Sequence, residues 1–166
     1  MRSDDKLLIF HGNVAHCVKY PDIELIEDGF IIVKDSKIVA VGGSDSLEEE
    51  KLRLNAEDAP VVHLKRSQLL IPGFVDTHIH AVQYPNSGLG YDKPLLDWLK
   101  EYTFPLEMRM RNEELAERVF EAVVKKTLSH GTTTAMYFGS LYDNICMLLV
   151  EAVVRQGQRA LLEKSI

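Results

Sequence analysis

The sequence contains little of what marks secreted or membrane proteins. Its two cysteines, Cys17 and Cys146, are far apart and form no CxxC pair. This excludes a dense disulfide framework and fits a reducing compartment. No apolar run approaches the ~20 residues of a transmembrane helix, and the run at residues 7–10 is too short for the core of a signal peptide. We therefore expect a cytoplasmic protein without a membrane partner.

Positive charge is also scarce. The 19 Lys and Arg residues are outnumbered by 25 Asp and Glu residues, which gives a formal net charge of −6. An acidic balance gives no electrostatic reason to expect nucleic acid as a partner. Hydrophobic residues make up 46% of the chain and charged residues 27%, which is typical of a folded soluble protein. The 166 residues provide one domain, or one domain and part of another.

Residues 1–68 have the pattern of a β-rich segment. Two apolar runs, residues 31–33 and 38–42, are joined by a polar turn and predict a β-hairpin. Residues 61–64 predict another short strand. Residues 45–58 are rich in Glu and Lys and fit an exposed short helix or loop.

From residue 69 onward the pattern becomes that of an α/β protein. The apolar run at residues 69–75, which contains a Pro-Gly pair, predicts a strand buried on both faces, as in a parallel sheet. The following elements are predicted in order: a helix around residues 94–102, a helix capped by Asn112 and ended by Gly131, a strand at 132–138, a helix at 143–156 and a strand from 159. This alternation indicates βαβ units and a parallel sheet.

Two histidines, His78 and His80, follow the predicted buried strand. Side chains at positions i and i+2 of a strand share a face, so both imidazoles can reach one metal ion. The C-terminal ends of strands are where α/β barrels place their active sites, and neutral imidazole is a good zinc ligand. An isolated HxH is more often two unconnected histidines. The strand before the pair and the βαβ pattern after it favour the metal site.

The sequence around the histidine pair resembles the amidohydrolase superfamily. Residues 72–80, Pro-Gly-Phe-Val-Asp-Thr-His-Ile-His, resemble the signature at its first barrel strand. Further segments resemble guanine deaminases in particular: residues 81–84 (Ala-Val-Gln-Tyr), 95–99 (Leu-Leu-Asp-Trp-Leu), 102–107 (Tyr-Thr-Phe-Pro-Leu-Glu), 130–135 (His-Gly-Thr-Thr-Thr-Ala) and 157–160 (Gly-Gln-Arg-Ala). The resemblance extends over residues 69–160 and is weaker in the β-rich segment.

The resemblance implies a fold and a reaction. Residues 69–166 would be the first strand–helix units of a (β/α)8 barrel, and residues 1–68 the β-rich segment of a small β-sandwich. The reaction would be the hydrolysis of guanine to xanthine and ammonia, with one zinc ion per full-length subunit and an acidic residue that moves the proton. The full-length protein would be a homodimer. Its small-molecule partner would be the purine substrate, guanine.

The resemblance also assigns residues to the site. His78 and His80 match the first two zinc ligands. Gln83 matches a position that hydrogen-bonds the purine, and its amide offers both a donor and an acceptor. His80, Ala81 and Val82 complete the predicted substrate-binding segment.

Other residues receive weaker predictions. Alternation puts Asp76 on the face of His78, but the resemblance makes it a supporting residue rather than a ligand. Trp98 and Phe104 are flat aromatic candidates for the purine pocket, and core residues are an equally good interpretation. His130 precedes a helix-ending glycine and is expected to be structural, and the histidines of the β-rich segment are not expected to be ligands.

The family's later metal ligands and its proton-transferring glutamate match no residue of this chain. A (β/α)8 barrel needs about 250 residues, so the sequence predicts an N-terminal fragment whose catalytic residues are incomplete. Two alternatives stay open: another amidohydrolase that deaminates a different purine or a triazine, and a non-catalytic truncated form that acts by binding to a subunit.

Overall fold

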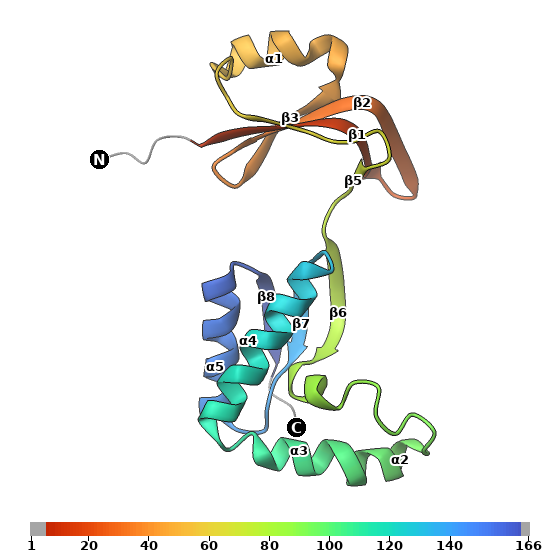
Figure 1. Ribbon diagram of the computed structural model, residues 1–166, viewed down its shortest axis with the longest axis vertical. Coiled ribbons are helices and arrows are strands. Elements are labelled where there is room, and N and C mark those ends of the chain that lie inside the picture. Colours follow the sequence, from red (N-terminus) through yellow and green to blue (C-terminus); the bar gives the residue numbers. More distant parts are fainter. Residues whose placement is uncertain (1–5, 164–166) are drawn as a thin grey trace, which may run out of the picture. The chain divides into compact units, whose positions relative to one another are not determined.

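The computed structural model describes residues 6–163 and divides the chain into two compact units, Met1–Pro72 and Gly73–Ile166 (Figure 1). Each unit has its own sheet and its own hydrophobic core. Among the described residues there is no helix with the length and apolarity needed to cross a membrane.

The first unit is a five-stranded sheet with one helix. Its elements are β1 (Leu7–Lys19), β2 (Asp22–Lys34), β3 (Lys37–Gly43), α1 (Leu47–Leu54), β4 (Val61–His63) and β5 (Leu69–Leu70). The strand order is β3-β2-β1-β4, with β5 beside β1; the first three strands are antiparallel, and β4 and β5 run parallel to β1. The predicted hairpin is confirmed as β2–β3, and the acidic segment forms α1.

The core of the first unit lies between one face of the sheet and α1. Ile9, Phe30 and Ile32 are fully buried, and Leu47 at the start of α1 packs with them. The helix ends at Leu54, and the left-handed backbone of the following Asn55 (φ 50°) lets its N–H donate to carbonyl oxygens of the last turn. These features explain why an otherwise charged segment is helical here.

The second unit has the predicted βαβ arrangement. Its parallel sheet contains β6 (Phe74–His80), β7 (Thr132–Phe138) and β8 (Arg159–Glu163) in that order. Helices α4 (Glu113–Ser129) and α5 (Asp143–Gln156) connect β6 to β7 and β7 to β8 (Figure 1). This confirms the predicted mixed α/β fold with a parallel sheet.

The ends of the two connecting helices follow the sequence signals. Asn112 caps α4, because its Oδ1 accepts a hydrogen bond from the backbone N–H of Leu115 at 2.9 Å. Gly131 (φ 90°) and Gly157 (φ 72°) take left-handed conformations after α4 and α5. The apolar faces of both helices pack against β7 in one core. The core includes Val119, Phe120 and Val123 of α4, Ile145 and Leu149 of α5, and Ala135 and Tyr137 of β7.

The segment between β6 and α4 is more helical than its sequence indicates. A 3₁₀ helix, η2 (Ala81–Asn86), follows β6 directly. The predicted helix around residues 94–102 begins after Pro94 and extends further, as α2 (Leu95–Trp98), the π-helical η3 (Leu99–Thr103) and α3 (Phe104–Arg109). π-helical turns are rare and frequently occur at functional sites.

The predicted single buried strand at residues 69–75 is wrong in two respects. Leu69 and Leu70 form β5 and pair with β1 in the first unit, whereas β6 begins at Phe74. Val75 is also 64% exposed, because in the described chain β6 has β7 as its one neighbour and α4 and α5 cover only one side of the sheet. The sequence indicated apolar character correctly, but apolar character alone does not say what covers a strand.

Candidate functional site

The two predicted metal ligands lie at the C-terminal end of β6, on one face of the sheet. Ile79 packs against the helix-covered core. Because side chains alternate along a strand, His78 and His80 point to the opposite, uncovered face. The structure therefore brings these two predicted residues together.

The imidazoles are close enough to bind one metal ion. Their Nε2 atoms lie 3.2 Å apart, and two nitrogens bound to one tetrahedral zinc ion are about 3.3 Å apart, given Zn–N bonds of 2.0–2.1 Å. A hydrogen bond between the rings has the same length. Within residues 6–163, no third His, Cys, Asp or Glu joins them in a possible metal site. The pair thus fits zinc as two ligands of a larger set.

Phe138, the last residue of β7, packs against both imidazoles. It is the register partner of His80. Its ring centroid lies 4.5 Å from that of His78 and 4.9 Å from that of His80, and the His80 ring is stacked on it at an interplanar angle of 21°. The aromatic ring limits the orientations open to the two histidines. The motif-based prediction did not include Phe138, because it lies 58 residues after His80 and only the β6–β7 pairing brings the two together.

The electrostatic environment favours neutral imidazole. Partial burial lowers the pKa of His80, the positive charge of a protonated His78 lowers it further, and Glu107 acts in the opposite direction. A metal ion binds the neutral form of the ring, so this environment suits a ligand.

Asp76 supports the pair through the backbone. Its Oδ1 accepts a hydrogen bond from the backbone N–H of His78 at 3.1 Å. The carboxylate thereby fixes the main chain at the first histidine. The supporting role that the resemblance implied for Asp76 stays a prediction.

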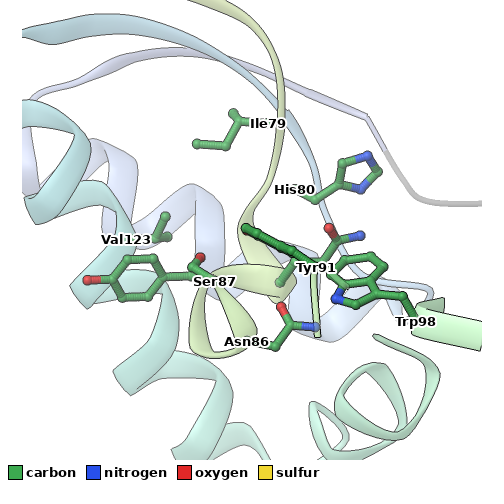
Figure 2. Close-up of a pocket in the computed structure, with 9 residues that line it drawn as sticks. Ile79, His80, Asn86, Ser87, Tyr91, Trp98 and Val123 are labelled. Atoms are coloured by element: carbon green, nitrogen blue, oxygen red, sulfur yellow. The ribbon is translucent and has the colours of Figure 1, made fainter. Parts of the chain in front are cut away.

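A pocket of about 210 Å³ adjoins His80 (Figure 2). Its lining comes from β6, from η2 and the loop after it, from α2 and from α4. The lining residues are Ile79, His80, Gln83, Tyr84, Asn86, Ser87, Tyr91, Trp98 and Val123. In Figure 2, His80 and Trp98 lie on one side of the pocket and Val123 on the other. Gln83 and His80 therefore line the same pocket, and the substrate-binding role of Gln83 stays a prediction.

The structure separates the other predicted substrate residues. Ala81 and Val82 are 0% and 3% exposed, and their side chains belong to the core of the second unit. Only their backbone is left to contact a ligand. Of the two aromatic candidates, Trp98 lines the pocket, whereas Phe104 is 52% exposed and is absent from its lining. Trp98 is held in place by a hydrogen bond from its Nε1 to the carbonyl oxygen of Leu89 at 2.7 Å.

The pocket residues that the motif-based prediction missed include Tyr84, Tyr91 and Asn86. Tyr84 and Tyr91 add aromatic surface, and Asn86 adds a polar group. Asn86 is 5% exposed; its Nδ2 donates to Thr103 Oγ1 at 3.4 Å, and its Oδ1 has no hydrogen-bond partner within the described chain. Asn86 and Tyr91 follow Gln83 within eight positions, so their proximity in sequence was the available signal.

The remaining four histidines contact residues other than His78 and His80. The Nδ1 atom of His130 is 2.9 Å from the carbonyl oxygen of Lys126, one turn back in α4, which agrees with a structural role. His11 and His63 face each other across β1 and β4, with 3.4 Å between their Nδ1 atoms. His16 pairs with Glu24 across β1 and β2 at 3.1 Å.

Comparison with known proteins finds guanine deaminases. The chain is 43% identical to a probable guanine deaminase of Schizosaccharomyces pombe over 94% of this chain and 30% of the relative. It is 39% identical to the guanine deaminase of Mus musculus over 98% of this chain and 36% of that relative. A crystal structure of guanine deaminase from C. acetobutylicum with bound guanine in the active site superimposes with a TM-score of 0.82 at 30% identity, covering 95% of this chain and 36% of that one.

These matches cover nearly the whole chain, which spans about a third of the length of the relatives. Residues 69–166, which include β6 with its histidine pair and the pocket beside it, match the amidohydrolase family. The chain therefore belongs to the amidohydrolase family.

Proposed function

We propose that this chain is the part of a zinc-dependent guanine deaminase that supplies the first two metal ligands and one wall of the purine pocket. The observation that supports this most directly is the geometry of His78 and His80, whose Nε2 atoms are 3.2 Å apart beside a pocket that contains Gln83. The relatives named guanine deaminase point to the same activity.

The fold proposal follows from the same likeness. The parallel sheet β6–β8 with α4 and α5 would be the opening strand–helix units of a (β/α)8 barrel, within the residues 69–166 that match the amidohydrolase family. Residues 1–68 contribute the β-rich part of a small sandwich. The uncovered face of the β6–β8 sheet, on which the histidines lie, would be the inside of that barrel.

Zinc is the proposed cofactor, and it supplies a Lewis acid that activates water at neutral pH. His78 and His80, whose Nε2 atoms lie 3.2 Å apart, would hold it. Asp76 orients the backbone of His78, and Phe138 limits rotation of both rings. A catalytic zinc site has at least three protein ligands, and residues 6–163 bring no third candidate ligand to the pair, so the site needs ligands beyond those that the described residues bring together.

Guanine is the proposed substrate, and the pocket has the chemistry for it. The amide of Gln83 offers a donor and an acceptor to the polar edge of a purine. Trp98 and Tyr91 offer flat apolar surface, and their ring centroids are 6.4 Å apart at the pocket wall. A polar group at the edge and aromatic surface on the faces suit a flat heterocycle.

The activity is tested in a chimaera, in which residues 1–166 replace the matching third of the Mus musculus guanine deaminase. We expect the chimaera to convert guanine to xanthine and to lose that activity when His78 or His80 is replaced by alanine. Adenine and a triazine are assayed beside guanine to separate the alternative amidohydrolases. A folded, zinc-loaded chimaera that ignores guanine and deaminates one of the other compounds would contradict the proposal.

A further inference from the structure

Of the Asp, Glu, Lys and Arg side chains in residues 6–163, one is buried. It is Glu107 in α3, with 8% of its surface exposed. A carboxylate in such a place destabilises the fold unless hydrogen bonds compensate it. Neither the zinc ligands nor the pocket lining includes Glu107. Its contacts therefore indicate what it does.

Two hydrogen bonds to its carboxylate come from the turn between β7 and α5. The hydroxyl of Ser140 donates to Glu107 Oε1 at 2.6 Å, and the backbone N–H of Leu141 donates to the same oxygen at 2.8 Å. Hydrogen bonds to an ionised carboxylate are roughly twice as strong as those between neutral groups. Glu107 thus fastens α3 to a turn that begins 32 residues later, at Gly139.

The fastened turn is fixed at further points. Ser140 is fully buried, and its carbonyl oxygen accepts a hydrogen bond from the thiol of Cys146 at 3.2 Å. The backbone N–H of Gly139 donates to the carbonyl oxygen of Glu163, at the end of β8, at 2.8 Å. These contacts position the C-terminal end of β7, where Phe138 lies.

Phe138 links the turn to the histidine pair. It is two residues before Ser140, and its ring lies 4.5 Å from His78 and 4.9 Å from His80. We propose that Glu107 is a positioning residue: by holding the β7–α5 turn, it keeps Phe138 packed on the imidazoles of His78 and His80. The importance of this packing for metal binding rests on the proposed function, whereas the packing itself does not.

The test reads the packing directly, by NMR of the His78 and His80 ring protons in the chain of residues 1–166. A stacked phenyl ring shifts these signals, and Phe138→Leu gives the positions without that ring. We expect Glu107→Ala to move both signals toward the Phe138→Leu positions. At a pH at which both imidazoles are neutral in every variant, Glu107→Gln should leave them near the parent positions, because the amide oxygen still accepts both hydrogen bonds.

A matched control separates positioning from general stability. Glu121 also joins two elements of this unit, because its Oε2 accepts a hydrogen bond from Gln156 Nε2 at 2.6 Å. Glu121→Ala should lower the melting temperature and leave the histidine signals in place. Parent-like signals in Glu107→Ala would overturn the proposal, and so would an equal displacement in Glu121→Ala. If Glu107→Ala does not fold, Ser140→Ala takes its place, and unmoved signals in that variant overturn the proposal.

The consequence for the metal is measured with zinc alone, followed through the same two histidine signals. Outer-shell changes weaken metal binding by about 10–100-fold, and we expect a loss in that range for Glu107→Ala but not for Glu107→Gln. If zinc leaves the parent signals unchanged, the proposed metal site is wrong. The positioning role is still decided by the signals measured without zinc.

Discussion

The Nε2 atoms of His78 and His80 lie 3.2 Å apart, at the end of the same strand and on the uncovered face of its sheet. We expect alanine at either position to reduce zinc binding by the chain by more than the about 10–100-fold effect of a second-shell change, because each substitution removes a direct ligand. Equilibrium dialysis with zinc measures the loss. His130→Ala is the control, since its imidazole contacts Ser129 and Lys126 at the end of its own helix. Unchanged zinc binding in both test variants would remove the pair from the metal site.

Gln83 is expected to act on substrate rather than on metal. In the chimaera, Gln83→Ala should lower kcat/KM for guanine about 10- to 100-fold, because a polar edge of the purine loses its partner at a cost of about 1–3 kcal/mol. Zinc content should stay at the parent level. Gln68→Ala removes a glutamine whose Oε1 binds the backbone of Lys65 and should leave both quantities unchanged. An unaltered kcat/KM in Gln83→Ala would show that this residue is not part of the site.

The 166-residue chain by itself is expected to form no xanthine, because the described residues provide two metal ligands and no third.

The chain should also associate as its concentration rises, since Val75 on β6 is 64% exposed and Leu161 on β8 is 67% exposed. Sedimentation of Val75→Lys should show weaker association. The same change at Val154, 74% exposed but on α5, serves as the control. A monomer at all concentrations, with measurable turnover, would contradict both expectations.

Tyr137 is expected to make stability depend on pH in the alkaline range. It is fully buried, and burial raises the pKa of its hydroxyl above 10.0. At pH values above 10.0 the unfolded tyrosine loses its proton while the folded one keeps it. The folded state then binds more protons, so the free energy of unfolding falls as the pH rises through this window.

Tyr137→Phe tests this through the denaturant unfolding transition of the second unit, which contains Tyr137, at about pH 8 and about pH 10.5. At the lower pH the variant should be less stable by about 1–3 kcal/mol, because the tyrosine hydroxyl donates to Gln158 Oε1 at 2.9 Å and the buried amide would lose that partner. At the higher pH the difference should shrink. Tyr20→Phe, at a position 90% exposed, should show neither effect. An equal difference at both pH values would mean that burial does not shift this group.

Local sequence signals predicted the second unit well. Asn112 and Gly157 mark helix ends through their own backbone and side-chain chemistry, so α4 and α5 have the expected positions. The placement of His78 and His80 on one face also followed from strand alternation alone. Gln83 reached the pocket because it is close in sequence to His80.

The parts that were missed depend on contacts distant in sequence. Phe138 meets the histidines only through the pairing of β6 with β7, and Glu107 meets Ser140 only through the fold of the second unit. The burial of Ala81 and Val82 follows from the turn of η2. This turn directs their side chains into the core, whereas the side chain of Gln83 lines the pocket. No local pattern encodes these relations.

The division of residues 69–75 between two sheets has a consequence for how the chain unfolds. Leu70 pairs with β1 and Val75 pairs with β7, so the strands on either side of Pro72 belong to separate sheets and separate compact units. Amide hydrogens in β1 and in β7 are then expected to exchange with solvent through different opening events, each with its own free energy. A denaturant titration should accordingly resolve two transitions, and a single free energy of unfolding does not describe the chain.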